Sequence, residues 1–260
     1  MTACGKVYLV GAGPGDEKLI TVYGLECIQN ADVIIYDRLV NQNLLKHAKS
    51  SAELIYCGKE PGKHARIQEQ IYTWLVEKAK QGKIVTRLKG GDPCVFGRAG
   101  EEAEVLARHG IPFEIVPGVT AGIAAPAYAG IPVTHRNYAA SFTIVTGHGR
   151  QEKGDDRLHW EGLAKGSDTL AFYMGIGNLP YICRKLIEHG KPVHTPVAVI
   201  EWGTTERQRT AVGTLQTISD IVKNAGLSHP AVIVVGEVVR LRETIQWFTE
   251  MEWGDAVATT

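Results

Sequence analysis

The sequence predicts an α/β protein made of two α/β domains, and three observations support that prediction. Short apolar runs rich in branched residues, typical of strands buried on both faces, alternate with helix-like segments in the first half of the chain. The same alternation starts again after residue 136. The 260 residues, of which 44% are hydrophobic, supply enough apolar chain for one large domain or two small ones.

The first half contains apolar runs that predict strands at residues 7–10, 33–36, 54–56, 84–88 and 113–116. Between the third and fourth runs, apolar residues at helical spacing form one stripe of an amphipathic helix, namely Ile67, Ile71, Trp74 and Leu75. We expect Gly82 to close that helix. Strands separated by helices pair in parallel through crossover connections, so this half is expected to form a parallel sheet.

The second half predicts strands at residues 142–146, 169–174, 197–201 and 231–235, and a helix at 179–189. Residues 151–165, with mixed charge, predict an excursion over the surface. We therefore expect an N-terminal domain at residues 1–134, a C-terminal domain at 135–245 and a tail at 246–260.

The composition excludes several classes of function. Basic and acidic residues are equal in number, 28 of each, so no global field draws the protein to nucleic acid or to an anionic membrane. Five cysteines without a C-x-x-C pair are typical of a reducing compartment, and the first apolar run is too short for a signal peptide or a membrane span. We therefore expect a cytoplasmic protein. The nine histidines lack H-E-x-x-H spacing, so no catalytic metal is expected.

A glycine-rich segment, Gly11 to Asp16, follows the first predicted strand. Glycines there permit a positive φ and let a ligand approach the backbone. A dinucleotide fingerprint would need a glycine in place of Asp16, although Asp37 stands where that fold has a ribose-binding acid. The segment fits a ligand site and a tight strand-to-helix turn about equally.

The segment Arg87 to Pro93 ends the fourth predicted strand with Gly90, Gly91 and Asp92. In an open α/β sheet, ligands bind beyond the carboxyl ends of the strands. Asp92 there can accept hydrogen bonds from ribose hydroxyls or pair with an ammonium group. A helix cap is the less favoured role for Asp92, because Pro93 and several further residues separate it from the next helix.

Asp37 and Lys59 follow two further strands, so we expect both at the same edge of the sheet, where an acid and an amine can act as base and acid. Taken alone, a residue of either type in a loop is more often a charged side chain exposed to solvent than a catalytic acid or base. Basic residues gather nearby, and a polyanionic small molecule explains such a cluster in a neutral protein. The cluster consists of Arg38, Lys63, His64 and Arg66.

Small or flexible residues follow other predicted strands as well. Thr120 lies in a segment, residues 117–122, that opens a small-residue helix, where it can act as an N-cap or contact a ligand. In the second half, Met174 and Gly203 lie at strand ends, and Met174 alone would be assigned to the core.

Taken together, five segments closely resemble the uroporphyrinogen III C-methyltransferase family, in the same order along the chain. They are residues 11–16, 31–40, 87–98, 116–121 and 130–136. The resemblance implies two α/β domains of the tetrapyrrole methylase type, with the active site in the cleft between them. It also implies that the protein binds S-adenosylmethionine in a folded shape and forms a homodimer.

The resemblance further implies roles for single residues. Asp37 matches the family's proton acceptor and Lys59 its proton donor. The residues that match the S-adenosylmethionine pocket are Pro14, Gly90, Gly91, Asp92, Val95, Thr120, Ala121, Met174 and Gly203, with Pro230 and Ala231 as weaker matches. Departures from the family pattern are small: Cys94, Ala99 and Ile67 replace a frequent phenylalanine, glycine and proline.

The implied substrate, uroporphyrinogen III, is an octacarboxylate macrocycle, which gives the basic cluster a purpose: charge-assisted hydrogen bonds to acetate and propionate groups. The side chains expected to bind it are Arg38, Lys63, His64, Arg66, Arg98 and Arg136, with Lys59. Methylation at C2 and C7 would give precorrin-2 by way of precorrin-1, for sirohaem or cobalamin. Arg87 and Lys89 are expected to be structural.

Two alternatives stay open. One is a relative in the same superfamily that acts on a later corrin precursor, or on a protein or RNA. The other is a dinucleotide-binding regulator without chemistry, in which Asp37 would hold a ribose. The absent glycine at position 16 weighs against the second alternative.

Overall fold

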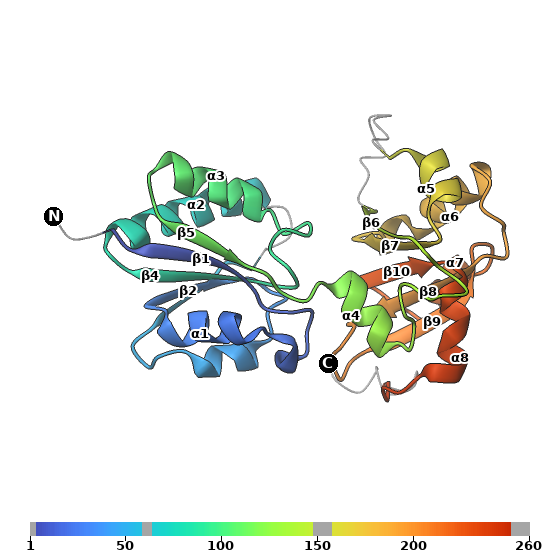
Figure 1. The fold of residues 1–260 in the computed structure, drawn as a ribbon, viewed down its shortest axis with the longest axis horizontal. Coiled ribbons are helices and arrows are strands. Elements are labelled where there is room, and N and C mark those ends of the chain that lie inside the picture. Colours follow the sequence, from blue (N-terminus) through green and yellow to red (C-terminus); the bar gives the residue numbers. More distant parts are fainter. Residues whose placement is uncertain (1–3, 59–63, 148–157, 251–260) are drawn as a thin grey trace. The chain divides into compact units, whose positions relative to one another are not determined.

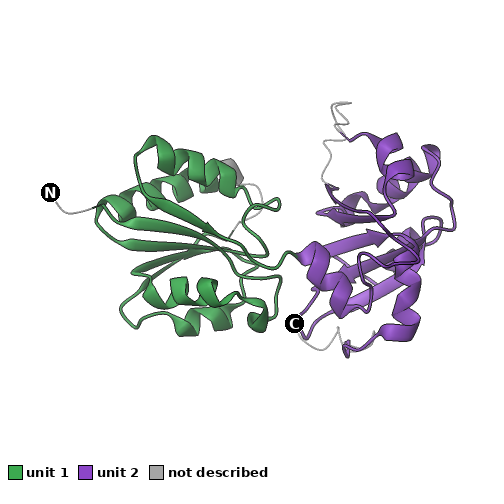
Figure 2. Ribbon diagram, in the orientation of Figure 1, with its two compact units in different colours: residues 1–120 green, residues 121–260 purple. Residues whose placement is uncertain are grey.

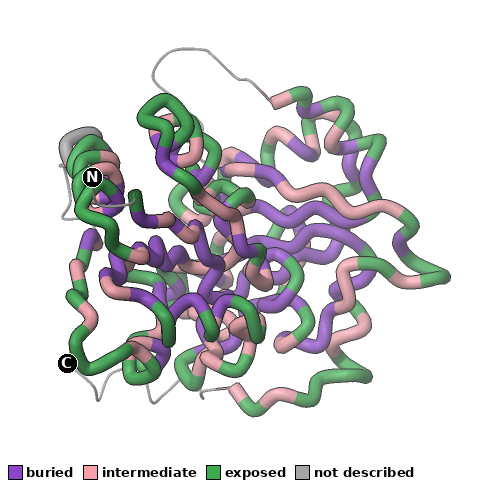
Figure 3. The backbone as a smooth tube through the Cα atoms, turned by 60° about the vertical axis from the view of Figure 1, so that its left-hand side comes forward, coloured by how far each residue is buried: buried purple, intermediate pink, exposed green. Residues whose placement is uncertain are grey.

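The computed structural model describes residues 4–58, 64–147 and 158–250, and leaves the side chains of residues 64–66 undescribed (Figure 1). The chain divides into two compact units, residues 1–120 and 121–260 (Figure 2). In both units the buried stretches follow the strands, while helices and loops carry most of the exposed residues (Figure 3). Within the described part of the chain, no helix is long and apolar enough to cross a bilayer.

The first unit is a parallel sheet with strand order β3-β2-β4-β1-β5. Its strands are β1 (Lys6–Gly11), β2 (Val33–Tyr36), β3 (Glu53–Tyr56), β4 (Ile84–Lys89) and β5 (Phe113–Val116). Every pairing among them is parallel, as the alternation of strands and helices predicts. All five carboxyl ends therefore lie at one edge of the sheet.

Helices cover both faces of this sheet (Figure 1). Helix α1 (Val22–Asn30) lies on one face, where Ile28 packs in a cluster with Ile34 and Leu88. Helices α2 (His64–Lys80) and α3 (Ala99–Arg108) lie on the other face. The predicted stripe of α2 faces the sheet, and Gly82 follows the helix with φ +80°. Short 3-10 segments connect these elements at η1 (Glu17–Leu19) and η2 (Gln42–His47).

The second unit is a mixed sheet with strand order β6-β7-β10-β8-β9. Strands β6 (Phe142–Thr146) and β7 (Thr169–Tyr173) are parallel, whereas β10 (Ala231–Val235) runs antiparallel to β7 and to β8 (Pro196–Glu201). The edge strand β9 (Arg209–Thr214) was not predicted. It forms an antiparallel pair with β8, and its alternation of polar and apolar residues is short and weak.

Helices of the second unit are α4 (Ala121–Tyr128), α5 (Trp160–Gly166), α6 (Leu179–Glu188), α7 (Ile218–Asn224) and α8 (Arg242–Ile245), with 3-10 segments η4 (Ile176–Asn178) and η5 (Glu237–Leu241). One core cluster lies under α5, α6 and α7, around Phe172 and Ile233. A second cluster joins Ala125 and Ala129 near α4 to Ala198 and Val234 of the sheet.

Three boundaries differ from the sequence predictions. The chain divides after Thr120 rather than near residue 134, because α4 packs its small residues on the second sheet. Within the predicted surface excursion at 151–165, Trp160 is only 5% exposed and starts α5; residues 151–157 lie outside the described part. The start of the predicted tail is also anchored, since Glu250 accepts hydrogen bonds from Gln208, Thr210 and Arg242.

Candidate functional site

Three glycine-containing loops meet at the carboxyl edge of the parallel sheet. The Ala12 amide donates to the Lys89 carbonyl at 2.7 Å, and the Gly91 amide donates to the Gly13 carbonyl at 2.7 Å. These bonds join the loop after β1 to the loop after β4. Both loops carry residues that the sequence assigned to a ligand site, including Pro14, Gly90 and Gly91.

The glycines at this edge are needed first for contact between the loops. A Cβ on Gly118 would lie 2.4 Å from the Gly91 oxygen and 2.7 Å from the Gly11 Cα. Gly91 also has φ +71°, which L side chains rarely adopt. The sequence suggested that these glycines let a ligand lie on bare backbone. The structure shows a second reason for them, which is the close packing of the loops against each other.

Asp92 fixes the loops after β4 and β5 to each other. Its Oδ2 accepts a hydrogen bond from the Gly118 amide at 3.0 Å, and its Oδ1 accepts one from the Cys94 amide at 2.8 Å. Each carboxylate oxygen has further acceptor capacity, so the same side chain can still accept from a ligand hydroxyl. Thr120 follows these loops, is 8% exposed, and directly precedes α4.

Asp37 directly follows β2 at the same edge. Its Oδ1 accepts a hydrogen bond from the Leu39 amide at 3.2 Å, and its Oδ2 lies 3.7 Å from Nη2 of Arg87. The Asp37 side chain is 30% exposed, so it is open to solvent on one side. The predicted proton donor, Lys59, lies outside the described residues.

The predicted cations are only partly described. Arg38 and Arg136 are exposed, and Arg136 belongs to the second unit. Arg98 forms a two-bond pair with Glu101, at 2.8 and 2.6 Å, so binding a substrate carboxylate there requires exchange of partners. Lys63 lies outside the described part; His64 and Arg66 belong to α2, and their side chains are not described.

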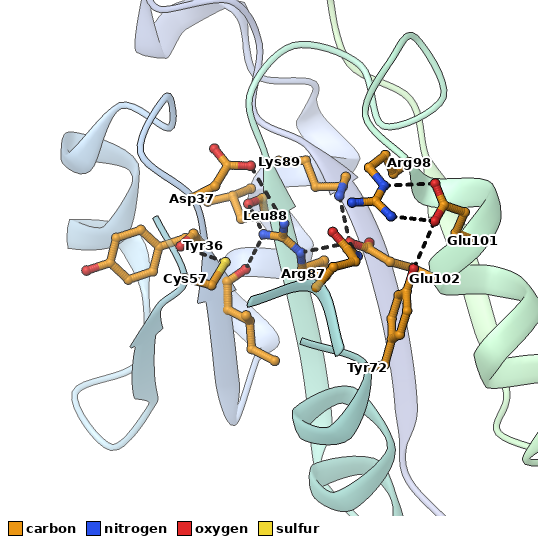
Figure 4. A network of polar contacts seen from close by, with 12 residues as sticks. Tyr36, Asp37, Cys57, Tyr72, Arg87, Leu88, Lys89, Arg98, Glu101 and Glu102 are labelled. Carbon is orange, nitrogen blue, oxygen red and sulfur yellow. Dashed lines mark hydrogen bonds and ion pairs between the residues drawn. The ribbon is translucent and has the colours of Figure 1, made fainter. Parts of the chain in front are cut away.

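Charged side chains that the sequence did not place in a network are buried behind Asp37 (Figure 4). Arg87 and Lys89 of β4 are 3% and 4% exposed, and Glu102 of α3 is fully buried. Glu102 Oε1 accepts from Lys89 Nζ at 2.8 Å and from Arg87 Nε at 3.4 Å. The sequence signal that could have revealed this network is the presence of Arg87 and Lys89 in a predicted strand beside Ile84, Val85 and Leu88, because buried charges need partners.

In the second unit, predicted cofactor residues also lie side by side at one sheet edge. Ala231 pairs with Glu201, and Val232 pairs with Tyr173, so the end of β7 and the start of β10 are adjacent. Met174 therefore lies beside the β10 start, and the Trp202 amide donates to the Pro230 carbonyl at 2.9 Å.

Gly203 and Ala121 belong to this unit as well. A Cβ on Gly203 would lie 2.4 Å from the Ala125 Cβ, so close packing on α4 requires glycine there. Ala121 is the first residue of α4. The Tyr173 hydroxyl accepts a hydrogen bond from the Gly122 amide, which ties the start of α4 to the end of β7.

Glu201 holds the loop that carries Pro230, a role that sequence reasoning missed. Its Oε1 accepts from the Ser228 amide at 2.7 Å, and its Oε2 accepts from Arg209 Nε at 2.9 Å and Nη2 at 2.6 Å. Arg209 in turn donates to the carbonyls of Ala225 and Gly226. Arg209 lies on the strand that was not predicted, so no sequence signal joined it to Glu201.

Backbone strain gathers at the same loops. Within the described chain, the non-glycine residues with positive φ are Phe96 (56°), Arg98 (62°), Met174 (53°), Trp202 (48°) and Thr204 (70°). All of them follow β4, β7 or β8, the strands whose carboxyl ends carry predicted cofactor residues. Such strain persists where surrounding structure enforces it, and it clusters at ligand sites.

The predicted cofactor residues thus form two groups. Pro14, Gly90, Gly91, Asp92, Val95 and Thr120 lie in the first unit, and Ala121, Met174, Gly203, Pro230 and Ala231 lie in the second. In each unit, most of them lie in loops at one sheet edge. The first group adjoins a carboxylate, Asp37, that is oriented by a backbone amide and a guanidinium and open to solvent, which suits it to accept a proton.

This chain is similar to known proteins over most of its length. The model of the family described as tetrapyrrole (corrin/porphyrin) methylases matches residues 6–219. A uroporphyrinogen-III C-methyltransferase of Priestia megaterium is 64% identical over 235 residues, which are 90% of this chain and 98% of that protein. A siroheme synthase of Thiobacillus denitrificans is 48% identical over 258 residues, which are 99% of this chain and 53% of that protein.

A solved structure is similar over nearly the whole chain. It is that of uroporphyrin-III C-methyl transferase from Thermus thermophilus complexed with S-adenyl homocysteine. The TM-score is 0.77 at 37% identity, and the match covers 91% of this chain and 100% of that one. The predicted fold class is confirmed by this likeness.

Proposed function

The chain belongs to the tetrapyrrole methylase family, and on that basis we propose that it transfers methyl groups from S-adenosylmethionine to uroporphyrinogen III. The observation that carries the substrate assignment is the 64% identity to a uroporphyrinogen-III C-methyltransferase over 98% of that protein's length. The methylated positions in the proposal are C2 and C7, which gives precorrin-1 and then precorrin-2.

The residues present fit S-adenosylmethionine. Met174 is an apolar residue that is 55% exposed, so a bound apolar group would bury its side chain. Its backbone has φ 53°, a costly conformation of the kind that gathers at ligand sites. Asp92 has acceptor capacity left for ribose hydroxyls beside the backbone of Gly91. In the proposal these residues hold the cofactor, together with Pro14, Gly90, Val95, Thr120, Ala121, Gly203, Pro230 and Ala231.

When bound, S-adenosylmethionine supplies an electrophilic methyl group on a sulfonium. The chain's own contribution is to align the electron-rich pyrrole carbon with that methyl and to exclude water. Asp37 accepts the proton that the ring gives up as positive charge develops on it. Lys59 assists proton movement or holds a substrate carboxylate. Alignment contributes more than acid and base chemistry in this proposal.

The substrate's carboxylates are assigned to the basic side chains. Arg38 is exposed one residue beyond Asp37, and Arg98 is held near the end of β4 by its pair with Glu101. A substrate carboxylate replaces Glu101 as the partner of Arg98 with the same bidentate geometry. Lys63, His64, Arg66 and Arg136 complete the proposed set.

The mass of the product tests the proposal. The purified protein is incubated with S-adenosylmethionine and enzymatically generated uroporphyrinogen III, and the product should gain two methyl groups. Asp37→Asn, which keeps the shape of the side chain and removes its charge, should lower kcat at saturating substrate by about 10²-fold or more. A substrate that gains no methyl group would overturn the substrate assignment, and an unchanged kcat for Asp37→Asn would overturn the base role.

The proposal extends to the setting of the reaction. The product supplies sirohaem synthesis, as the likeness to a siroheme synthase supports, or cobalamin synthesis. The reaction takes place in the cytoplasm, without a metal, and the active form is a homodimer. Intermediates of the two routes, measured in cells that lack the protein, distinguish the pathways.

A further inference from the structure

Two buried cations of β4 face a buried carboxylate of α3 (Figure 4). Val85 of β4 packs in the core under α2 and α3, and alternate residues of a strand share a face. Arg87 and Lys89 therefore point into the same layer, where they meet Glu102. The Nε2 amide of Gln68 on α2 also donates to Glu102 Oε1, at 3.4 Å.

Arg87 connects this buried cluster with the predicted base. Its Nε donates to Glu102 Oε1 at 3.4 Å, and its Nη1 donates to the carbonyls of Ile35 at 3.3 Å and Leu88 at 3.1 Å. Its Nη2 lies 3.7 Å from Asp37 Oδ2. The guanidinium is planar and rigid, so fixing its Nε and Nη1 also fixes where Nη2 presents its charge.

The charges do not balance within the cluster alone. Burial lowers the pKa of Lys89, and the charge of Arg87 lowers it further, while Glu102 opposes both. Burial would also lower the pKa of Arg87, but Glu102, Cys57 and Asp37 together raise it. Arg87 therefore stays cationic, and Glu102 is shared between two cations. Asp37 is the second carboxylate that pairs with Arg87.

Stability alone does not account for this arrangement. A buried ion pair is commonly no more stabilising than apolar side chains of similar volume, because both charges lose their hydration. Glu102 Oε2 is buried, and none of the described residues gives it a hydrogen-bond partner. The cluster is thus costly, and it lies directly behind the only carboxylate that the sequence assigned to proton transfer.

We propose that Arg87 is a positioning residue for Asp37, with Glu102 as the anchor that fixes its guanidinium. The Leu39 amide holds Oδ1 of Asp37, and Arg87 holds Oδ2, so the carboxylate keeps one orientation and still has acceptor capacity for a proton. This inference rests on the proposed function, because it takes Asp37 to be the base. It adds a specific dependence: the contribution of Asp37 requires Arg87.

A double-mutant cycle tests that dependence. Arg87→Lys keeps the charge but loses the planar fork, and we expect kcat to fall at least tenfold with little change in the KM for S-adenosylmethionine. In an Asp37→Asn background the same substitution should change kcat less than twofold, because two residues that act as a unit are not additive. An equal fold loss in both backgrounds would overturn the proposal.

Lys89→Met is the matched control. It disturbs the same buried cluster, but its ammonium bonds to Glu102 rather than to Asp37. The fold loss in kcat caused by Lys89→Met should therefore be the same in the wild type and in the Asp37→Asn background. If Lys89→Met instead loses its effect in the Asp37→Asn background as strongly as Arg87→Lys does, the coupling to Asp37 reflects general loosening of the cluster, and the proposal is overturned. Should Arg87→Lys not fold, Glu102→Gln replaces it in the cycle, because it removes the anchoring charge and keeps the shape.

Failure of the proposed function can be told from failure of this inference. If the wild-type protein does not methylate uroporphyrinogen III, the substrate assignment fails, and crystal structures of the wild type and of Arg87→Lys then decide the inference. Asp37 should keep one side-chain conformer in the wild type and lose it in the variant. An unmoved Asp37 in the variant would overturn the positioning role, and so would methylation with a kcat unaffected by Asp37→Asn.

Discussion

At the residue scale, the site depends on contacts between backbones. Gly11 ends β1 and Gly118 follows β5, and a Cβ on either residue would meet main-chain atoms of the other and the carbonyl oxygen of Gly91. Main-chain atoms cannot turn aside as the end of a flexible side chain can, so a substitution has to move a loop. Asp92 bonds across the same junction.

Gly118→Ala tests that dependence. The added methyl would lie 2.4 Å from the Gly91 oxygen, so we expect a loss of about 1–3 kcal/mol in the free energy of unfolding and weaker binding of S-adenosylhomocysteine. Denaturant titration and calorimetric titration measure the two effects.

Gly100→Ala is the control for that experiment. Gly100 lies in α3, and a Cβ there meets nothing within 4 Å. The substitution should stabilise the protein by roughly 0.5–1 kcal/mol through the unfolded state. A Gly118→Ala protein as stable as the Gly100→Ala protein would contradict the packing argument.

At the element scale, the first turn of α3 is tied both to the loop after β4 and to α2. Glu101 accepts from Arg98 and, at 3.1 Å, from the Tyr72 hydroxyl of α2. The hydrogen bonds from Arg98 and then from Tyr72 lower the pKa of Glu101 to about 2 from its ordinary value of 4.5. The same helix carries Glu102, so this turn sets the position of the buried cluster as well.

The pKa of Glu101 predicts a pH dependence. Between pH 4.5 and about 2, Glu101 binds fewer protons in the folded state than in the unfolded state. The contribution of the Glu101–Arg98 pair to the free energy of unfolding is therefore fully present above pH 4.5 and is lost as the pH falls toward 2. The side chains of Arg98 and Glu101 are 42% and 51% exposed, so the pair contributes less than about 1 kcal/mol to the free energy of unfolding.

Glu101→Gln should therefore lower the free energy of unfolding near neutral pH, and its difference from the wild type should shrink as the pH falls. Denaturant titrations across that range measure the difference. Arg98→Met, which removes the partner, should reproduce the same trend. A difference that grows in acid would contradict the sign of the pKa shift.

At the scale of the whole molecule, each of the two units has its own sheet and cores, and each carries part of the predicted cofactor set. A ligand that binds only the native state stabilises it by RT ln(1 + L/Kd), where L is the ligand's concentration, so the effect grows with that concentration relative to the Kd. The response of unfolding to ligands therefore distinguishes a methylase from the dinucleotide-binding alternative.

S-adenosylhomocysteine at about 100 times its Kd should stabilise the folded protein by about 2.7 kcal/mol, which corresponds to roughly 5–10 °C in Tm. NAD at the same concentration should leave the Tm unchanged. A differential scanning measurement compares them, and a rise in Tm with NAD alone would favour the dinucleotide-binding alternative.

The sequence by itself determined the first sheet almost completely. The strand at residues 33–36 has its predicted bounds, because a strand buried on both faces is a continuous apolar run with a clear local signal. The edge strand at residues 113–116 also has its predicted bounds, although it contains Glu114 and is mostly only partly buried. The positions of Asp37, Gly91 and Asp92 at the carboxyl edge follow from the same pattern, since parallel strands end at one edge.

Only the tertiary structure decided the rest. The antiparallel course of β10, the edge strand β9 and the packing of α4 on the second sheet depend on contacts between residues distant in the chain. The same is true of the pairing of Arg87 with Glu102 and Asp37. Local periodicity reports which face of an element is buried, whereas the partner across that face is set by how the elements pack.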